Sequence, residues 1–235
     1  MLSIIIPCLN EAAGIRDTLR ALRPLRKRGA ELIVVDGGSS DGTPAFAAPW
    51  ADLVLTAPRG RASQMNAGAA RASGAILFFL HADSVPPAES DALIVDGLHR
   101  TRRNWGRFDA RIAGSHPLLR VVETFMNLRS RLTGVATGDQ GIFVTKYLFT
   151  AVGGYPEIAL MEDIALTKRL KGFGAPLCLK HRISTSARRW ERDGVLRTLF
   201  LMWRVRLAFW LGADPNRLAI RYDANRTSLE PISKG

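Results

Sequence analysis

Cysteine is scarce in this sequence. Only Cys8 and Cys178 occur among its 235 residues, and they lie in separate apolar stretches. Two such cysteines supply neither a disulfide framework nor the paired spacing of a zinc site. A reducing compartment is the simplest environment for them, so we expect a cytoplasmic protein.

Long uninterrupted apolar runs are missing as well. A membrane-spanning helix needs roughly 18 or more such residues, and the nearest candidate, 195–211, is broken by Arg197, Arg204 and Arg206. Residues 1–7 lack the basic start and the long apolar middle of a signal peptide. We expect a protein that is soluble or attached peripherally to the inner face of the cell membrane.

Acidic residues are in the minority. Asp and Glu number 21 against 33 Lys and Arg, which gives a formal charge of +12. This charge favours an anionic partner, either a nucleic acid, a nucleotide or a phospholipid surface. A basic nucleic-acid-binding protein is therefore one alternative. Because the arginines are spread along the whole chain without a recognisable reading motif, no nucleic acid is expected as the partner.

The composition that remains is that of a globular protein. Apolar residues make up 47% of the chain and charged residues 23%, so it can bury a core and is not generally disordered. Glycine and proline are at ordinary frequency, which excludes collagen-like and low-complexity classes. No repeat or linker interrupts the sequence, and we expect one domain over residues 1–235.

The first half alternates short apolar runs with helical spacing. The strands predicted there are 2–6, 31–36, 52–56 and 75–80. The helices predicted there are 15–25, with Asn10 placed to help start it, 63–72 and 88–102. This alternation favours an α/β fold with a mostly parallel sheet that is covered by helices on both faces.

Polar clusters follow three of the four predicted strands, at residues 10–11, 36–43 and 81–84. Ligands of parallel sheets bind outside the carboxyl ends of the strands. We therefore expect these clusters to open onto one edge of the sheet and to form a binding site there.

The second half is less regular. It predicts a strand at 105–112, a turn entering a strand at 138–143, and helices at 164–171 and 195–211, the last being the final helix. A further helix is predicted at 118–132, with its apolar positions at Leu118, Val121, Val122, Phe125 and Leu128.

Three residues near the predicted strand ends are candidates for a nucleotide site. Asp83 could hold Mg²⁺ or Mn²⁺ together with substrate phosphates, or simply form the turn before Pro86. Asp36 could accept a hydrogen bond from a base or ribose, or serve the turn that follows it. Arg61 precedes a small-residue helix and could clamp a diphosphate, or lie in solvent.

Two further groups suggest transfer chemistry. Glu162 and Asp163 form an acid pair at a predicted helix start, where one carboxylate could deprotonate a hydroxyl or merely favour the helix dipole. Arg189 and Trp190 could contact a sugar or a leaving diphosphate, or Trp190 could anchor a core. The histidines are scattered, and neither a zinc enzyme nor a serine hydrolase is indicated.

The order of these motifs is more specific than any one of them. Ile6-Pro-Cys-Leu-Asn-Glu11, Val34-Val-Asp-Gly-Gly-Ser-Ser-Asp-Gly-Thr43, Leu80-His-Ala-Asp83, Glu162-Asp163 and Arg189-Trp190 follow one another. The series, which covers about residues 2–190, resembles the family 2 glycosyltransferases of GT-A fold. Among these it is most similar to the small stand-alone bacterial members associated with radical-SAM/selenodomain proteins.

The resemblance implies the fold and a set of site residues. The fold would be a mostly parallel, Rossmann-like sheet with helices on both faces. The donor-nucleotide residues would be Pro7, Leu9, Glu11, Asp36, Arg61, Gln64, Ala82 and Asp83. Asp83 would also bind Mn²⁺ or Mg²⁺. Asp163, paired with Glu162, would be the general base. The acceptor and diphosphate side would include Gly138, Asp139, Gln140, Arg189 and Trp190.

Three positions depart from the family pattern. His81 replaces the first acid of the metal motif, Gly37 replaces a frequent second aspartate, and Ser186 replaces the glutamine of the Gln-x-x-Arg-Trp element. The first two weaken the inferred contacts to ribose and base. The third argues against processive polysaccharide synthesis.

The resemblance further implies a function. The protein would be a metal-dependent, inverting glycosyltransferase that uses a UDP-sugar or another nucleotide-diphosphate sugar. Residues 1–103 would bind the donor, residues 104–194 would bind the acceptor and carry the chemistry, and residues 195–235 would form a C-terminal helix and tail. A catalytically inactive nucleotide-sugar-binding homologue is a second alternative.

The predicted helix over residues 195–210 mixes arginine with aromatic residues, as interfacial helices do. One hypothesis is that it contacts an anionic membrane and presents a lipid-linked acceptor. A core helix whose arginines extend to solvent explains the pattern equally well.

Overall fold

The computed structural model describes residues 1–227, and for residues 221 and 223–227 the backbone alone. Eight strands within this range form one sheet in the order β3-β2-β1-β4-β7-β6-β8-β5. The strands are β1 Leu2–Cys8, β2 Glu31–Asp36, β3 Leu53–Thr56, β4 Ile76–Phe79, β5 Ser84–Val85, β6 Trp105–Ala113, β7 Ile142–Thr145 and β8 Leu177–Ser186. Strands β1 to β4 are parallel, and β7 runs antiparallel between β4 and β6. The predicted mostly parallel sheet is confirmed.

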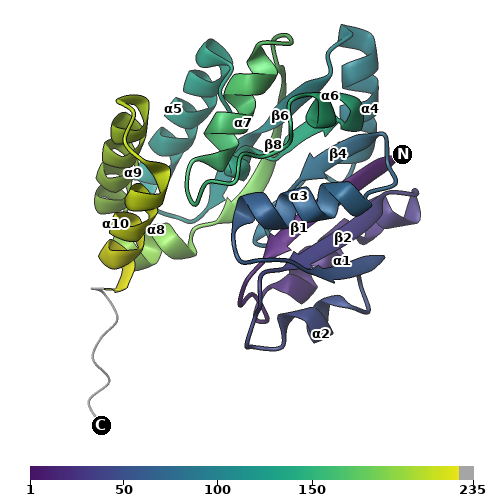
Figure 1. The fold of residues 1–235 in the computed structure, drawn as a ribbon, viewed down its shortest axis with the longest axis horizontal. Coiled ribbons are helices and arrows are strands. Elements are labelled where there is room, and N and C mark those ends of the chain that lie inside the picture. The colour runs from purple at the N-terminus through teal and green to yellow at the C-terminus, as the bar shows by residue number, and fades with distance from the viewer. Residues whose placement is uncertain (228–235) are drawn as a thin grey trace.

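Helices surround this sheet (Figure 1). They are α1 Ile15–Lys27, α2 Thr43–Ala47, α3 Arg61–Arg71, α4 Ser90–Thr101, α5 Pro117–Thr133, α6 Lys146–Ala151, α7 Glu162–Lys171, α8 Arg188–Asp193, α9 Val195–Trp210 and α10 Pro215–Thr227, with a 3₁₀ turn η1 at Gly138–Gln140. Within residues 1–227, none of them is long and apolar enough to span a bilayer.

Alternating side chains of the central strands build two cores. Ile4 and Ile6 of β1 face α1 and α4, whereas Ile5 between them faces α3 on the other side of the sheet. Successive strand residues point to opposite faces, so a continuous apolar run such as that of β1 is what a sheet covered on both faces requires. Helices therefore lie on both faces, as predicted.

Helix α5 forms where a helix was predicted, but its apolar side chains lie largely on the outside. The exposed fractions are 65% for Phe125 and 48% for both Val121 and Leu128, while Glu123 and Asn127 are buried. The reason lies in β6, which pairs with β7 only over Trp105–Arg107. Beyond that stretch, one edge of β6 has free backbone groups that must find partners.

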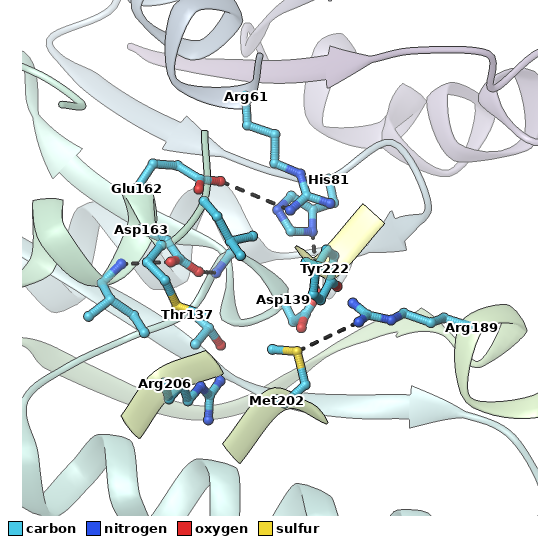
Figure 2. A pocket seen from close by; sticks show the side chains of 14 residues that line it. Arg61, His81, Thr137, Asp139, Glu162, Asp163, Arg189, Met202, Arg206 and Tyr222 are labelled. Carbon is cyan, nitrogen blue, oxygen red and sulfur yellow. Dashed lines mark hydrogen bonds and ion pairs between the residues drawn. The ribbon is translucent and has the colours of Figure 1, made fainter. Parts of the chain in front are cut away.

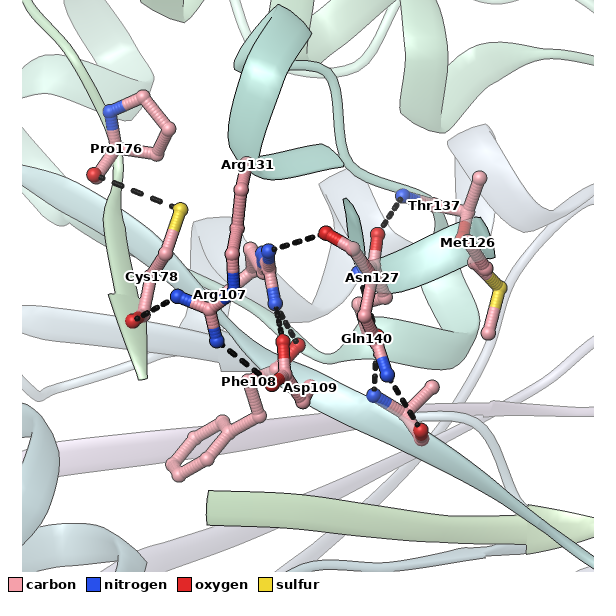
Figure 3. Close-up of polar contacts among 11 residues, drawn as sticks. Arg107, Phe108, Asp109, Met126, Asn127, Arg131, Thr137, Gln140, Pro176 and Cys178 are labelled. Atoms are coloured by element: carbon pink, nitrogen blue, oxygen red, sulfur yellow. Dashed lines mark hydrogen bonds and ion pairs between the residues drawn. The ribbon is translucent and has the colours of Figure 1, made fainter. Parts of the chain in front are cut away.

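The polar side chains of α5 supply those partners. Asn127 bonds both the N–H of Ala110 (2.9 Å) and its carbonyl oxygen (3.0 Å), and Glu123 accepts from the N–H of Ile112. Figure 3 shows the same helix contacting the fully buried Arg107, which bonds Asp109 and the carbonyl oxygen of Asn127. Apolar spacing alone could not reveal that the polar side of α5 is the buried one.

The C-terminal region corrects the prediction that 195–211 is the final helix. Residues 195–210 form a helix as expected, but it is not the last one, because α10 follows it. The two pack together through Val205 and Leu218. Figure 1 shows α9 and α10 beside α5, at the end of the molecule away from the N-terminus.

Asn10 has a different position from the one predicted. It does not cap α1, which begins at Ile15 behind Gly14. Instead, Asn10 takes a left-handed conformation (φ 54°), and its Oδ1 accepts from the N–H of Ser40 at 2.9 Å. It therefore ties together the loops that follow β1 and β2.

Candidate active site

The loops after three parallel strands are held together at one sheet edge. The N–H of Asn10 donates to Ser39 Oγ (2.8 Å), and the N–H of Glu11 donates to Thr43 Oγ1 (2.9 Å). On the other side, Thr18 Oγ1 donates to the carbonyl oxygen of Ala82 (2.6 Å). The three polar clusters therefore meet, as the strand order predicted.

Asp36 and Gln64 shape this edge from inside. Asp36 is buried, and its Oδ2 accepts from the N–H groups of Gly38 and Ser39, both at 2.9 Å. Gln64 is buried too, and its Nε2 donates to the carbonyl oxygens of Cys8 (2.8 Å) and Val35 (2.7 Å). In this structure both side chains fix the loop backbone. Pro7 lies buried in β1, and Leu9 follows the strand half-buried.

Arg188 of α8 reaches the same edge from the C-terminal half. Its Nη2 lies 3.0 Å from Glu11 Oε2 and 3.9 Å from Asp83 Oδ2. The arginine thus bridges two of the predicted donor residues, although Glu11 is 177 positions away from it in the sequence. Sequence spacing gives no indication of this contact.

Asp83 fits a particular kind of metal site. Within residues 1–227, no three His, Cys, Asp or Glu side chains gather into a group that could hold an ion. Asp83 itself is partly exposed, in the loop between β4 and β5. Mg²⁺ in nucleotide sites is commonly bound by one or two carboxylates plus substrate phosphates. Asp83 therefore suits an ion that is shared with a diphosphate.

A small cavity of about 80 Å³, which opens to solvent, lies beside this edge. Figure 2 shows its side chains converging from α3, the loop after β4, η1, α7, α8, α9 and α10. The lining residues are Arg61, His81, Thr137, Gly138, Asp139, Leu160, Met161, Glu162, Asp163, Ile164, Arg189, Met202, Arg206 and Tyr222. Arginine and carboxylate side chains face the same space, which suits a ligand with both anionic and hydroxyl groups.

The predicted acid pair opens α7 at the wall of this cavity. Glu162 is buried, with Oε1 4.0 Å from Arg61 Nη1. Burial raises the pKa of Glu162, and the adjacent charge of Asp163 raises it further, against a smaller opposing effect of Arg61. Asp163 is held by two backbone donors: Gly138 to its Oδ2 (2.7 Å) and Ile164 to its Oδ1 (2.6 Å). The orientation of the Asp163 carboxylate is therefore fixed.

His81, the departure from the family pattern, pairs with Asp139 of η1. Its Nδ1 lies 3.3 Å from Asp139 Oδ1. Burial is the largest single effect and opposes the charge on both partners. Their hydrogen bond and the nearby opposite charges together outweigh it, so the pKa of His81 is raised and that of Asp139 is lowered to about 2. The imidazole also lies against Gly138, where a Cβ would come within 2.2 Å of His81 Nε2. Only glycine fits at position 138.

The remaining predicted residues divide between the cavity and the core. Arg189 lines the cavity, with its guanidinium 4.6 Å from the centre of the Tyr222 ring. Trp190 instead packs against the core cluster that includes Ile112 and Leu119, as the core-anchor alternative proposed. Gln140 is buried and closes a capping box with Thr137 at η1.

Sequence reasoning misses the C-terminal contribution to the cavity. Met202, Arg206 and Tyr222 come from α9 and α10. In the sequence pattern, Arg206 stands only as an interruption of an apolar run. An arginine on the inward face of an amphipathic helix is the signal that could have found it.

Comparisons with known proteins agree with this geometry. A family model described as "Glycosyl transferase family 2" matches residues 3–146. "Probable glycosyltransferase YdaM" of Bacillus subtilis is 26% identical over 87% of this chain and 53% of its own length. An "Uncharacterized glycosyltransferase" of Mycobacterium tuberculosis is 32% identical over 65% of this chain and 62% of its own. The chain thus spans roughly half to three fifths of these relatives.

Two solved structures share the fold. A mannosyltransferase of Pyrobaculum calidifontis in complex with GDP-Man and Mn²⁺ has a TM-score of 0.65 and 21% identity, over 88% of this chain and 60% of its own. Staphylococcus aureus TarS in complex with UDP has a TM-score of 0.65 and 17% identity, over 79% of this chain and 60% of its own.

Proposed function

Because the chain belongs to glycosyl transferase family 2 and has the GT-A fold, we propose that it transfers a sugar from a nucleoside diphosphate to an acceptor hydroxyl, with inversion at the anomeric carbon. The observation that carries this proposal is the cavity in which the acids Glu162 and Asp163 face the arginines Arg61 and Arg189. A UDP-sugar is the donor we propose first, since the TarS structure that shares the fold is a complex with UDP.

Asp163 is proposed as the general base. It takes the proton of the acceptor hydroxyl as the oxygen attacks the anomeric carbon. The bond between that carbon and the diphosphate oxygen breaks, and its electron pair leaves with the nucleoside diphosphate. The two backbone hydrogen bonds to Asp163 support this role, because they hold the carboxylate in one orientation throughout the step.

Arg61 and Arg189 are proposed to stabilise the leaving diphosphate. Both guanidinium groups line the cavity, on α3 and α8, and fixed positive charges lower the barrier where negative charge develops. A Mn²⁺ or Mg²⁺ ion held by Asp83 would neutralise further charge on the diphosphate. Relatives in fold crystallised with Mn²⁺ or with Mg²⁺ support divalent metal use.

The same geometry supports separate roles for three segments of the chain. We propose that residues 1–103 bind the donor and that residues 104–194 supply the base and the acceptor side. Residues 195–235, which include α9 and α10, would complete the acceptor cavity. The order of motifs further supports membership of the radical-SAM/selenodomain-associated subgroup.

Nucleotide binding is the direct test of this proposal. Thermal unfolding of the full chain is measured with UDP, GDP, dTDP, CDP or CMP, each with and without Mn²⁺. A ligand at about 100 times its Kd adds about 2.7 kcal/mol of stability, which raises Tm by about 5–10 °C for a chain of this size. We expect such a rise for one diphosphate, and only with the metal.

The absence of a shift with every nucleotide would contradict the proposal and favour the nucleic-acid-binding alternative. An inactive homologue that still binds donor would give the shift without turnover. A nucleic-acid-binding protein would give none, and would instead bind an oligonucleotide with an affinity that falls steeply as salt is added.

We also propose a peripheral contact with an anionic membrane, which would bring the enzyme to a lipid-linked acceptor. Helices α5 and α9 contact each other, and each leaves an apolar stripe exposed. On α9, the exposed residues recur at helical spacing: Leu196, Phe200, Trp203, Leu207 and Trp210. Arg197 and Arg204, which directly follow Leu196 and Trp203 in the sequence, are exposed beside this stripe. Cations beside an apolar face are complementary to anionic headgroups.

Vesicle co-sedimentation tests this contact. We expect the chain to sediment at low salt with vesicles containing phosphatidylglycerol, but not with pure phosphatidylcholine. Burying one large aromatic side chain contributes about 1.5–3 kcal/mol, so Phe200→Ser with Trp203→Ser should weaken binding at least a hundredfold. The control is Phe173→Ser, at an exposed aromatic outside both helices. Equal binding of the double variant and the control would contradict the proposal.

A further inference from the structure

Two arginines of the cavity wall, and a third on the neighbouring helix α5, carry buried donors that lack an acceptor. Among the described residues, Nε of Arg206, Nε of Arg189, and both Nε and Nη2 of Arg129 are inaccessible to solvent and without a hydrogen-bond partner. Buried polar groups in native proteins are nearly always paired, and an unpaired charged donor is especially unfavourable. Such a cluster is typical of a site whose ligand supplies the acceptors.

Arg206 lines the cavity, and Arg129 stands on the helix beside it. Arg206 projects from α9 and lines the cavity together with Thr137 and Asp163 (Figure 2). Arg129 comes from α5, the helix that contacts α9. Burial and, after it, the positive charge of Arg206 lower the pKa of Arg129 to about 10. The charge of each arginine therefore disfavours the charge of the other.

The nearby carboxylate does not resolve this repulsion. The negative charge of Asp163 acts to raise the pKa of Arg129. Both oxygens of Asp163, however, already accept hydrogen bonds from backbone N–H groups. No ion pair joins Arg129 or Arg206 to a carboxylate within residues 1–227. An external anion would supply both a negative charge and hydrogen-bond acceptors here.

We infer that Arg206 and Arg129 form an anion subsite for a phosphate group of the acceptor. This rests on the proposed glycosyl transfer and narrows its acceptor to a phosphorylated compound. Two guanidinium forks suit a phosphate, whose several oxygens can accept from both. The donor diphosphate already has Arg61 and Asp83. Arg206, in contrast, lies on α9, outside residues 3–146 that match the family.

Inorganic phosphate is the probe for the subsite. Its affinity for the full chain is measured by calorimetry, without nucleotide and without vesicles, for the parent and for Arg206→Met, Arg129→Met and Arg100→Met. Met keeps much of the side-chain length and removes the donors. We expect at least a tenfold loss of phosphate affinity in the first two variants. We expect no loss in Arg100→Met, the control, because Arg100 is an exposed arginine of α4 with no place in the cavity.

A second measurement guards against misfolded variants. Because the buried guanidinium groups lack partners, their removal should leave Tm unchanged or raised when no anion is present. Arg206→Lys, which keeps the charge but loses the fork, should retain part of the phosphate affinity. A large fall in Tm for both Met variants would show that the arginines hold the fold together and would overturn the inference.

The remaining outcomes separate this inference from the proposed function. Equal phosphate binding in all variants would mean an adventitious ion only. A parallel loss of affinity for UDP with Mn²⁺ in Arg206→Met would assign the arginines to the donor diphosphate and overturn the acceptor subsite. If no nucleotide binds the parent but phosphate binding still depends on Arg206, the proposed glycosyl transfer fails while the anion site stands.

Two sources of the phosphate group are then distinguished by competition. Undecaprenyl phosphate in detergent micelles, or a soluble hexose phosphate, is added against inorganic phosphate. Displacement by the first alone identifies a lipid phosphate, and displacement by the second identifies a soluble one. Displacement by neither would overturn the acceptor assignment.

Discussion

Asp163→Asn lowers kcat for sugar transfer by about a thousandfold, within the range of roughly 10²–10⁴ that a general base contributes. Asparagine has the size of aspartate but cannot take up the acceptor proton. The amide oxygen of asparagine can still accept a backbone hydrogen bond, from Gly138 or from Ile164. The amide NH2 group would face the other N–H, so that two donors meet without an acceptor. We therefore also expect a loss of about 1–3 kcal/mol in unfolding free energy.

The measurement combines steady-state turnover with nucleotide binding. Donor affinity should change little in Asp163→Asn, since the base acts on the acceptor. Glu162→Gln is the matched comparison, because Glu162 is the neighbouring acid and its charge is engaged by Arg61. If Glu162→Gln removes turnover while Asp163→Asn retains it, the roles of the two acids are exchanged.

Asp83→Asn abolishes the part of donor affinity that depends on Mn²⁺. Asp83 is the carboxylate proposed to hold the ion, and among residues 1–227 no three His, Cys, Asp or Glu side chains form a group that could hold it by protein alone. A neutral amide binds a divalent cation much more weakly than a carboxylate does. The Tm rise of about 5–10 °C with the preferred diphosphate and Mn²⁺ should therefore disappear.

The control for Asp83 is Asp96→Asn, which makes the same change at an exposed aspartate of α4. Its metal-dependent Tm rise should equal that of the parent. Asp83→Asn should also free Arg188 from one of its two carboxylate neighbours, so its Tm without ligand is compared as well. An undiminished metal-dependent shift in Asp83→Asn would place the ion elsewhere.

The strand part of the fold is predictable because its sequence signal is local. β1 and β2 are continuous apolar runs that end in turn residues, and a parallel sheet brings the ends of such runs to one edge. Asp36, Asp83 and the loops around them follow directly. The Glu162–Asp163 pair is found by motif order, and its place in the cavity depends on α7 beginning there.

The features that the sequence does not predict depend on partners far along the chain. The apolar side of α5, with Phe125, lies outside because Glu123 and Asn127 on its other side bond the free edge of β6. The role of Arg206 depends on α10 and on the packing of α9 against it. Neither hydrophobic periodicity nor motif spacing contains that information.

Gly138 joins three parts of the site that come from different regions of the sequence. Its N–H holds the carboxylate of Asp163, and its missing side chain admits the imidazole of His81. His81 in turn lies two residues before Asp83 and is bonded to Asp139. The proposed general base and the loop proposed to meet the diphosphate are therefore joined through Gly138. We expect a donor that displaces this loop to move Asp163 as well, so that the donor binds first and aligns the base before the acceptor enters.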